Sequence, residues 1–289
     1  MFVCGGVARR CEATNLSGRE TNHADVEPTL SIYSKIRGVG RRGKRLLARA
    51  QRFRSSTAGF CTVCDRRTRF YDWTVNQRES GHCGWCGAKS RQRALAHLIR
   101  ETYKGTLANL GQGVTIFNTE CHGPMHDELV RNPVYTCSEY LGEGYEPGQM
   151  VNGVRHEDLQ SLSFGDNTYD LVISTEVFEH IPDPYLAHRE VLRVLKPGGR
   201  HIFTVPYVAK WEEDCVRAVL EDGKVRHLMC PEYHYDPIRP EGVLVYTIFS
   251  PAMQKRLAQL GFQVTTHPMV DARFGILGAN VVFDCQKPV

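Results

Sequence analysis

Residues 158–207 contain the most regular pattern in the chain, DLQSLSFGDNTYDLVISTEVFEHIPDPYLAHREVLRVLKPGGRHIFTVPY. Within it, residues 169–174 form a nearly continuous apolar run, as expected of a parallel strand that is buried on both faces. Residues 201–205 form a second run, which is rich in aromatic and β-branched side chains. The pattern therefore predicts two strands of one sheet, separated by a segment long enough for a helix.

The segment between the two runs has the signals of a helix. Pro182 and Pro184 lie where its first turn should begin, and Pro197-Gly198-Gly199 is expected to end it. The residues that would form its apolar face are Leu186, Val191, Leu192 and Leu195. A strand, a helix and a parallel strand make up the right-handed crossover unit of a doubly wound sheet, so we predict an α/β fold of that type.

Polar side chains follow the ends of both predicted strands. The first run ends with Ser174, Thr175 and Glu176, with Glu179-His180 shortly after, and the second run is followed by Pro206-Tyr207. Ligands of doubly wound sheets bind beyond the carboxyl ends of the strands. These residues are therefore expected to border a binding pocket.

With these motifs, the chain resembles the class I S-adenosylmethionine-dependent methyltransferases, and in particular the type 11 methyltransferases. The resemblance rests on an acidic residue ahead of an SF turn, on YDLVIS, on EH before a proline loop, and on LRVLKPGGRHIFTVP. It covers roughly residues 114–289. It implies a doubly wound, mostly parallel, seven-stranded Rossmann-like sheet with an antiparallel final strand, and S-adenosylmethionine as the cofactor.

The resemblance also implies contacts for the adenosine part of the cofactor. Glu139 lies at the end of the expected second strand and would accept hydrogen bonds from both ribose hydroxyls, a task suited to a carboxylate. At the end of the third strand, Asp158 would meet the adenine amino group and Leu159 its ring. After the fourth strand, Ser174 and Thr175 would border the cofactor. The alternative role of Asp158 is to cap a loop.

The loop after the first predicted strand departs from the family pattern. The family has an acidic residue and a Gly-x-Gly-x-Gly turn there, whereas this chain has Phe117-Asn118-Thr119-Glu120-Cys121-His122-Gly123. Glycines at this turn let the backbone approach the ligand closely, so side chains would narrow the pocket. Gly123 matches the last family glycine, and Thr119 and Glu120 would instead hydrogen-bond the methionine moiety. We expect a working loop, and the alternative is a domain that no longer binds the cofactor.

Residues 207–249 interrupt the alternation of strands and helices and are expected to form a lid or a substrate-binding segment. They contain Tyr233-His234-Tyr235-Asp236-Pro237, which combines aromatic surface, an imidazole and a carboxylate. A surface turn without a partner is the alternative. Methyl transfer needs a base only where the acceptor arrives protonated. His180 and His234 are the candidate catalytic residues, because imidazole titrates near neutral pH.

Four cysteines form two matched pairs ahead of the predicted sheet. Cys61 and Cys64 are separated by two residues, as are Cys83 and Cys86, which is the spacing of a four-thiolate zinc site. Each pair places two sulfurs on one tight turn, and zinc prefers a tetrahedral set of ligands. A closed set of four thiolates has no open position, so we predict a structural zinc in a small ribbon or knuckle module at residues 58–90. Redox-active cysteines are the alternative.

The charge of the chain is unevenly distributed. The 289 residues carry a formal net charge of +4, yet residues 1–58 hold twelve Lys or Arg against four Asp or Glu. Residues 1–57 are therefore predicted to be a basic, largely disordered leader with a broken amphipathic helix over residues 30–53. We expect a solvated tail, and a role at a membrane surface or on a nucleic acid is the alternative. No apolar run suits a secretory signal or a membrane span, so we expect a cytoplasmic protein whose paired cysteines bind metal.

The predicted organisation is a leader at 1–57, a zinc module at 58–90, a linking helix at 91–110 capped by Ser90, and a methyltransferase domain at 111–289. We expect methyl transfer to a small-molecule acceptor, such as a sugar, a glycan or a secondary metabolite. The first alternative is an RNA methyltransferase that uses the zinc module and the basic leader. Against it, the rest of the chain is net acidic, and no Asn-Pro-Pro-Tyr motif is present. The second alternative is a non-catalytic scaffold that keeps the fold without the cofactor.

Overall fold

The apolar run at residues 169–174 forms strand β8 (Tyr169–Thr175), near the centre of a six-stranded sheet with the order β16-β17-β9-β8-β4-β5. The computed structural model describes residues 55–111, 113–235, 239 and 241–289. The other strands of the sheet are β4 (Ile116–Asn118), β5 (Tyr135–Cys137), β9 (Leu195–Thr204), β16 (Gln263–Asp271) and β17 (Ile276–Gln286). Four strands, β4, β5, β8 and β9, run parallel, and β17 is antiparallel to both of its neighbours. The α/β class and the antiparallel final strand are confirmed.

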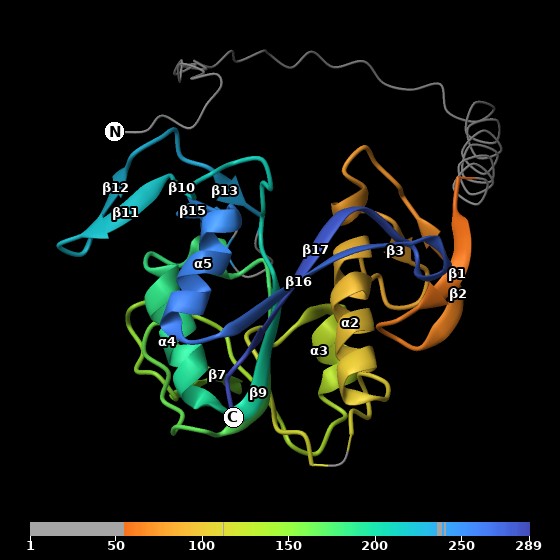
Figure 1. Ribbon diagram of the computed structural model, residues 1–289, viewed down its shortest axis with the longest axis horizontal. Helices are drawn as coiled ribbons and strands as arrows, with labels where there is room; N and C mark the ends of the chain where they lie inside the picture. Colours follow the sequence, from red (N-terminus) through yellow and green to blue (C-terminus); the bar gives the residue numbers. More distant parts are fainter. Residues whose placement is uncertain (1–54, 112, 236–238, 240) are drawn as a thin grey trace, which may run out of the picture. The chain divides into compact units, whose positions relative to one another are not determined.

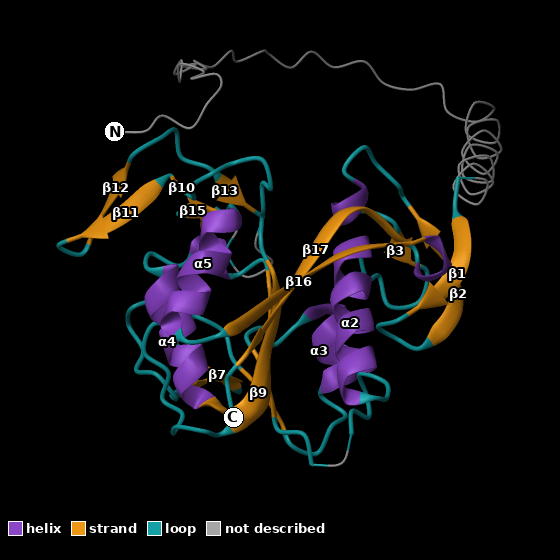
Figure 2. Ribbon diagram, in the orientation of Figure 1, coloured by secondary structure: helices purple, strands orange, loops and turns teal. Residues whose placement is uncertain are grey.

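Helices cover both faces of the sheet (Figures 1 and 2). One face carries α2 (Ser90–Tyr103) and α3 (Gly123–Leu129), and the other carries α4 (Pro184–Val194) and α5 (Pro251–Leu260). The side chains of β8 alternate accordingly. Leu171 and Ile173 belong to the core under α2 and α3, whereas Val172 belongs to the core under α4 and α5. Burial on both faces accounts for the continuous apolar run.

The predicted helix between β8 and β9 is α4. Asp183 caps it, because a carboxylate oxygen accepts hydrogen bonds of 3.1 and 3.0 Å from two N–H groups of the first turn. The helix ends at Val194, however, and Pro197-Gly198-Gly199 forms an irregular start of β9 instead of the predicted helix end. A Cβ at Gly199 would meet the carbonyl oxygen of Tyr169 at 3.0 Å, so glycine is required there by the close approach of β8.

The seventh strand implied by the family resemblance is not found among the described residues. The segment that should supply it pairs with itself as a hairpin of β6 (Met150–Val151) and β7 (Val154–Arg155). Asn152 and Gly153 form its turn with φ angles of 50° and 82°, the left-handed values that a two-residue hairpin favours. In the described part of the chain, one isolated parallel bridge, between Glu139 and His156, extends the sheet beyond β5. Strands β6 and β7 thus pair with each other and not with β5.

The segment with the four cysteines folds as three short antiparallel strands, β1 (Thr57–Cys61), β2 (Arg66–Tyr71) and β3 (His82–Cys83), with the short helix η1 (Gln77–Glu79) before β3. The prediction that Ser90 caps α2 is wrong, because the helix begins at Ser90 and Lys89 is its cap. The Ser90 hydroxyl donates to the carbonyl oxygen of Leu277 (2.8 Å) and accepts from the N–H of the same residue (2.9 Å). The hydroxyl therefore joins α2 to β17.

Residues 207–249 form three short two-stranded ladders, β10–β15, β11–β12 and β13–β14. Their bounds are β10 (Cys215–Val216), β11 (Ala218–Glu221), β12 (Lys224–His227), β13 (Tyr233–His234), β14 (Val243–Leu244) and β15 (Thr247–Ile248). The predicted helix at residues 30–53, nearly all of the predicted leader, and Asp236 and Pro237 lie outside the described residues. No described helix combines the length and the apolar composition that crossing a membrane requires.

Arg93 of α2 is fully buried and joins three parts of the fold. Its guanidinium donates to the carbonyl oxygens of Phe274 (2.9 Å) and Gly275 (2.6 Å) between β16 and β17, and to that of Ala88 after the cysteine pairs. Its Cζ lies 4.1 Å from the centroid of the Phe70 ring. Burial lowers the pKa of Arg93 to about 10, while the nearby cysteine sulfurs favour its charge, so it remains cationic at neutral pH.

Replacing Arg93 with methionine should reduce the free energy of unfolding by about 3 kcal/mol or more, because three buried carbonyl oxygens lose a charged donor. Urea unfolding followed by circular dichroism measures the loss. Arg189→Met, at an exposed arginine of α4, is the matched control and should change stability by no more than about 0.5 kcal/mol. An Arg93→Met protein as stable as the control would contradict this role of Arg93.

Candidate functional site

The four parallel strands end at one edge of the sheet, here called the carboxyl edge, and bring separate segments together there. After β4, the backbone N–H of Thr119 donates to the carbonyl oxygen of Ile173 in β8 (3.1 Å). The hydroxyl of Thr175, the last residue of β8, donates to Oε2 of Glu120 (2.7 Å). The loop predicted to meet the methionine moiety is therefore held against the end of β8.

Glu139 follows β5 and faces the same loop. Its Oε1 lies 2.7 Å from the backbone nitrogen of Cys121 and 2.7 Å from Nδ1 of His122, both hydrogen-bond distances. Its side chain is 13% exposed, and its Oε2 makes no hydrogen bond with the described residues. The carboxylate thus lies at the carboxyl edge, where the resemblance implies the ribose. Binding both ribose hydroxyls there would require His122 to leave Oε1.

Two buried polar atoms, Oδ1 of Asn118 at the end of β4 and Oγ1 of Thr119 in the loop that follows, have no hydrogen-bond partner among the described residues. A buried polar atom without a hydrogen bond reduces the stability of the fold by about 1–3 kcal/mol. A polar ligand that bonds to these atoms would remove this penalty. Burial raises the pKa of Glu120, although the bond from Thr175 opposes the shift. Gly123 begins α3 with a φ of 82°, and no described atom lies within 4 Å of where its Cβ would be. Glycine at 123 therefore serves the backbone conformation.

The other predicted cofactor residues lie in different surroundings. Oδ1 of Asp158 accepts a hydrogen bond from the N–H of Gln160 (2.8 Å), as in the loop cap considered as its alternative role. Leu159 is buried in the core under α4 and α5. Ser174 is buried inside the sheet, with its Oγ 3.0 Å from Nε2 of His201, whose pKa burial lowers to about 3. Leu159 and Ser174 thus contribute to the core, whereas Asp158 belongs to a loop.

Glu176 and Arg78 form an ion pair that no sequence pattern indicated. Arg78 belongs to η1, between the two cysteine pairs, and its Nη1 and Nη2 lie 2.9 and 2.5 Å from the two carboxylate oxygens of Glu176. Burial by itself would raise the pKa of Glu176, but the charges of Arg78 and Arg91 hold it at about 2. The cysteine-containing segment therefore reaches the carboxyl edge and contributes a charged side chain to it.

His180 and His234, the predicted catalytic residues, lie next to each other. His180 ends the short helix η2 (Phe178–His180) after β8, and His234 belongs to β13 of the insertion. Their ring centroids are 5.0 Å apart, and the rings are nearly perpendicular, at 88°. The carboxylate of Glu179 lies beside both, so the insertion contacts the polar residues that follow β8.

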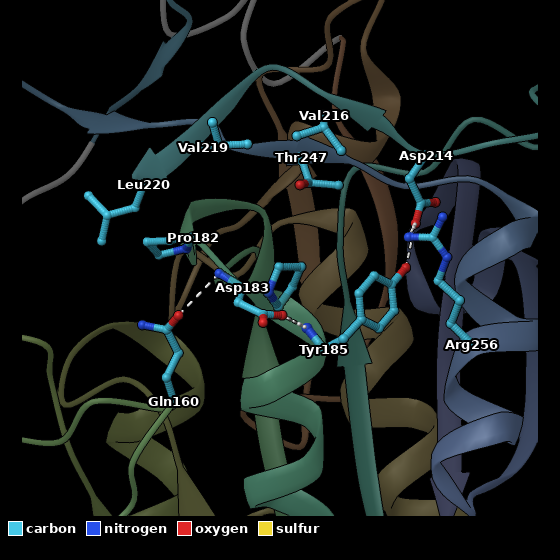
Figure 3. A pocket seen from close by; sticks show the side chains of 11 residues that line it. Gln160, Pro182, Asp183, Tyr185, Asp214, Val216, Val219, Leu220, Thr247 and Arg256 are labelled. Atoms are coloured by element: carbon cyan, nitrogen blue, oxygen red, sulfur yellow. Dashed lines mark hydrogen bonds and ion pairs between the residues drawn. The ribbon is translucent and has the colours of Figure 1, made fainter. Parts of the chain in front are cut away.

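A surface pocket of about 390 Å³ lies between the start of α4 and the insertion (Figure 3). Its lining includes Tyr185 of α4 and the apolar side chains of Val216 and Val219 from the insertion. The Tyr185 hydroxyl donates to Asp214, and Nη1 of Arg256 lies 3.6 Å from the same carboxylate. This network ties the insertion to α4 and α5. The volume is within the range of pockets that take small molecules.

The four cysteines Cys61, Cys64, Cys83 and Cys86 come together as one cluster, here called the four-cysteine cluster. The Sγ atoms of Cys61 and Cys86 are 3.7 Å apart, those of Cys64 and Cys83 are 3.9 Å apart, and all four lie within 4.8 Å of one another. A zinc tetrahedron with Zn–S bonds of about 2.3 Å has edges of about 3.8 Å. The four side chains are free thiols, so the donor set and its spacing fit zinc.

Comparison with known proteins identifies a methyltransferase segment. Residues 138–203 match the family model described as a methyltransferase domain. The matched segment contains Glu139, Asp158 and Glu179-His180 but not the atypical loop after β4. This match supports a class I S-adenosylmethionine-dependent methyltransferase.

Similar proteins include a cycloartenol-C-24-methyltransferase of Oryza sativa subsp. japonica, which is 25% identical over 199 residues, 64% of this chain and 55% of the relative. The uncharacterized protein YafE of Escherichia coli is 54% identical over 65 residues, 22% of this chain and 31% of the relative. An S-adenosylmethionine dependent methyltransferase structure from Mesorhizobium loti has a TM-score of 0.41 and 13% identity, over 69% of this chain and 99% of that one. The chain thus spans about half of the rice relative and about a third of the Escherichia coli one.

The ion pair predicts how stability changes with pH when Glu176 is replaced by glutamine. The pKa of Glu176 is about 2 in the folded protein, below its ordinary 4.5, so its carboxylate stabilises the fold above about pH 4.5 and loses that effect as the pH falls toward 2. The free energy of unfolding of the wild-type protein should exceed that of Glu176→Gln by about 3 kcal/mol near neutral pH. The difference should be smaller at about pH 3.

Denaturant unfolding at several pH values measures this difference. Glu212→Gln, at an exposed glutamate, is the control and should stay within about 0.5 kcal/mol of wild type throughout. A Glu176→Gln difference that grows on acidification would contradict a stabilising ion pair.

Proposed function

We propose that this protein transfers a methyl group from S-adenosylmethionine to a small-molecule acceptor. The observation that carries the proposal is Glu139, a carboxylate at the carboxyl edge after β5, inside the segment that matches the methyltransferase domain. The six-stranded Rossmann-like sheet and the partnerless polar atoms of the neighbouring loop support it.

Residues at the carboxyl edge would hold the cofactor from two sides. Glu139 would accept the ribose hydroxyls, and the hydroxyl of Thr119 and the carboxylate of Glu120 would face the methionine end. Asp158 would offer its remaining oxygen to the adenine amino group. Thr175 acts through Glu120, because its hydroxyl is bonded to that carboxylate. Side-chain bonds among these residues would replace the missing glycine turn.

The cofactor, when bound, supplies a methyl group: a lone pair of the acceptor bonds to the methyl carbon as the carbon–sulfur bond breaks, and the bonding pair stays on sulfur. The chain's task is then to position the acceptor and, where the acceptor is a hydroxyl, to take up its proton. His180 and His234 are the imidazoles available beside the end of β8. The insertion would form the acceptor side, since it supplies His234 and one wall of the pocket in Figure 3.

The lining of that pocket includes neither the two histidines nor the residues proposed to hold the cofactor, and its volume would suit a small acceptor such as a sugar, a glycan unit or a secondary metabolite. The names of two relatives also refer to small molecules, cycloartenol in Oryza sativa and sarcosine or dimethylglycine in Halorhodospira halochloris. The acceptor of this chain is proposed at the level of that class.

We further propose that the four-cysteine cluster holds a structural zinc ion. Four thiolates around one zinc ion carry a net negative charge, and the buried cation of Arg93 lies close enough for the sulfurs to favour its charge. The metal would fix the turn that carries Arg78, and through it the contact with Glu176. Its role would be to complete the site's structure, since four protein ligands leave no open position.

Replacing Glu139 with alanine should weaken S-adenosylmethionine binding by roughly 10–100-fold, because charged hydrogen bonds to the ribose contribute about 1.5–3 kcal/mol. Isothermal titration calorimetry measures the affinity, and Glu146→Ala, at an exposed glutamate, should bind like wild type. Equal affinity in the Glu139→Ala protein would refute the ribose contact. Absence of binding to the wild type at millimolar cofactor would refute the enzymatic proposal itself.

Replacing Cys61 and Cys86 together with serine should remove one equivalent of zinc per chain and lower the melting temperature, because a metal that binds only the folded state stabilises it. Elemental analysis of purified protein measures the zinc. Cys137→Ser, a cysteine outside the four-cysteine cluster, should retain the wild-type zinc content. Unchanged zinc in the double variant would reject the four-thiolate site.

A further inference from the structure

A buried carboxylate that accepts no hydrogen bond from the described residues lies beside the two histidines at the end of β8. Glu179 is 0% exposed, and neither of its carboxylate oxygens has a hydrogen-bond partner among the described residues. Leaving a buried carboxylate in this state is costly unless a cation or a proton compensates it. Glu176, the nearest other carboxylate in sequence, adds repulsion and is itself paired with Arg78.

The two imidazoles beside Glu179 have defined orientations. Nδ1 of His180 lies 2.8 Å from the carbonyl oxygen of Leu244, so it carries the hydrogen and leaves a lone pair on Nε2. That Nε2 lies 3.6 Å from Oε1 of Glu179. Nδ1 of His234 lies 3.7 Å from the same oxygen, while its Nε2 is 3.5 Å from a carboxylate oxygen of Glu232. Each ring therefore has one nitrogen toward Glu179 and the other toward an oxygen acceptor.

This arrangement is the one that metal-binding histidines adopt. A ligating imidazole usually gives its second N–H to a carbonyl or a carboxylate, which fixes the ring and its tautomer. The carbonyl oxygen of Leu244 has that position for His180, at 2.8 Å, and the carboxylate of Glu232 lies on the corresponding side of His234 at 3.5 Å, the distance of an ion pair. The ligand atoms of Glu179, His180 and His234 all lie within 4.8 Å of one another.

The separations between these ligand atoms also fit a metal ion held among them. Distances of 3.6 and 3.7 Å are too long for direct hydrogen bonds, which end at about 3.2 Å. Two ligands on one zinc ion, each about 2.0–2.2 Å from it in tetrahedral geometry, lie about 3.4 Å apart. The observed separations are close to this ligand–ligand distance.

We propose that Glu179, His180 and His234 bind a divalent transition-metal ion of the zinc type, as a second metal site separate from the four-cysteine cluster. Two imidazoles and one carboxylate are ligands typical of such ions. Three protein ligands leave at least one position open. The site opens toward solvent on the His234 side, because that side chain is 36% exposed while Glu179 is fully buried.

If the protein transfers methyl groups as proposed, the open coordination position can bind the acceptor. The ion would bind a hydroxyl oxygen of the acceptor and lower its pKa, so that the proton passes to solvent and an oxygen lone pair becomes available for the methyl carbon. His180 and His234 would then act as ligands in place of the general base considered above. The proposed acceptor is therefore narrowed to a small molecule with a hydroxyl group.

The test uses the full chain and zinc alone as the probe. Apo protein is titrated with Zn²⁺ by calorimetry, and the bound metal is counted after gel filtration. The wild type should bind two equivalents, and the Cys61→Ser and Cys86→Ser double variant should bind one. Glu179→Gln and His234→Ala should each also bind one, with the thiolate site intact, whereas His227→Ala, at an exposed histidine of β12, should bind two.

A variant that does not change the proposed ligands tests the site if Glu179→Gln does not fold. Glu232→Gln leaves all three ligands in place and should weaken the second equivalent by about 10–100-fold. Retention of two equivalents by His234→Ala, or one equivalent in the wild type that the cysteine double variant loses, would overturn the second site. Measuring S-adenosylmethionine binding to the same proteins separates the two proposals. A protein that binds the cofactor but only one zinc ion would contradict the second metal site alone. A protein that binds two zinc ions but no cofactor would contradict the proposed methyl transfer alone.

Discussion

The bidentate ion pair between Arg78 and Glu176 connects the cysteine-containing segment to the central sheet. A buried carboxylate at the end of β8 needs a counter-charge, and the chain supplies it from the segment between the two cysteine pairs. Arg91 and Glu79 extend the pair into a set of two cations and two anions. The cysteine-containing segment is therefore built into the carboxyl edge of the sheet, and removing it would leave Glu176 buried without its bidentate partner.

Side-chain hydrogen bonds order the same edge, where the family pattern has glycines that let the backbone approach the ligand. Thr175 holds Glu120, and Glu139 holds the backbone of Cys121, so the loop after β4 is fixed from two strands. In the proposed function this is a preorganised but closed arrangement, because His122 occupies Glu139. Cofactor binding would exchange that contact for the ribose, and the exchange would reduce affinity relative to an open glycine turn.

The sequence predicted the parts of the fold that local patterns determine. Residues 169–174 are apolar because β8 is buried on both faces, and α4 begins at Pro184, one of the two prolines expected in its first turn. The missing seventh strand could not be foreseen from the family resemblance, although Asn152-Gly153 was a visible hairpin signal. Contacts between distant segments left no local pattern: the pairing of Ser174 with His201, and of Arg78 with Glu176, depends on the folded sheet. Likewise, the sequence placed Glu179-His180 after β8, but it gave no sign that His234 of the insertion lies beside both.

The proposed methyl transfer depends on Glu139 binding the cofactor at the carboxyl edge of the sheet. A crystal structure of the zinc-loaded chain with S-adenosylhomocysteine tests this most directly. It should show the ligand's ribose hydroxyls within hydrogen-bond distance of the Glu139 carboxylate and His122 displaced from it. A ligand bound elsewhere, or bound with the contact between His122 and Glu139 intact and the ribose away from the carboxylate, would contradict it.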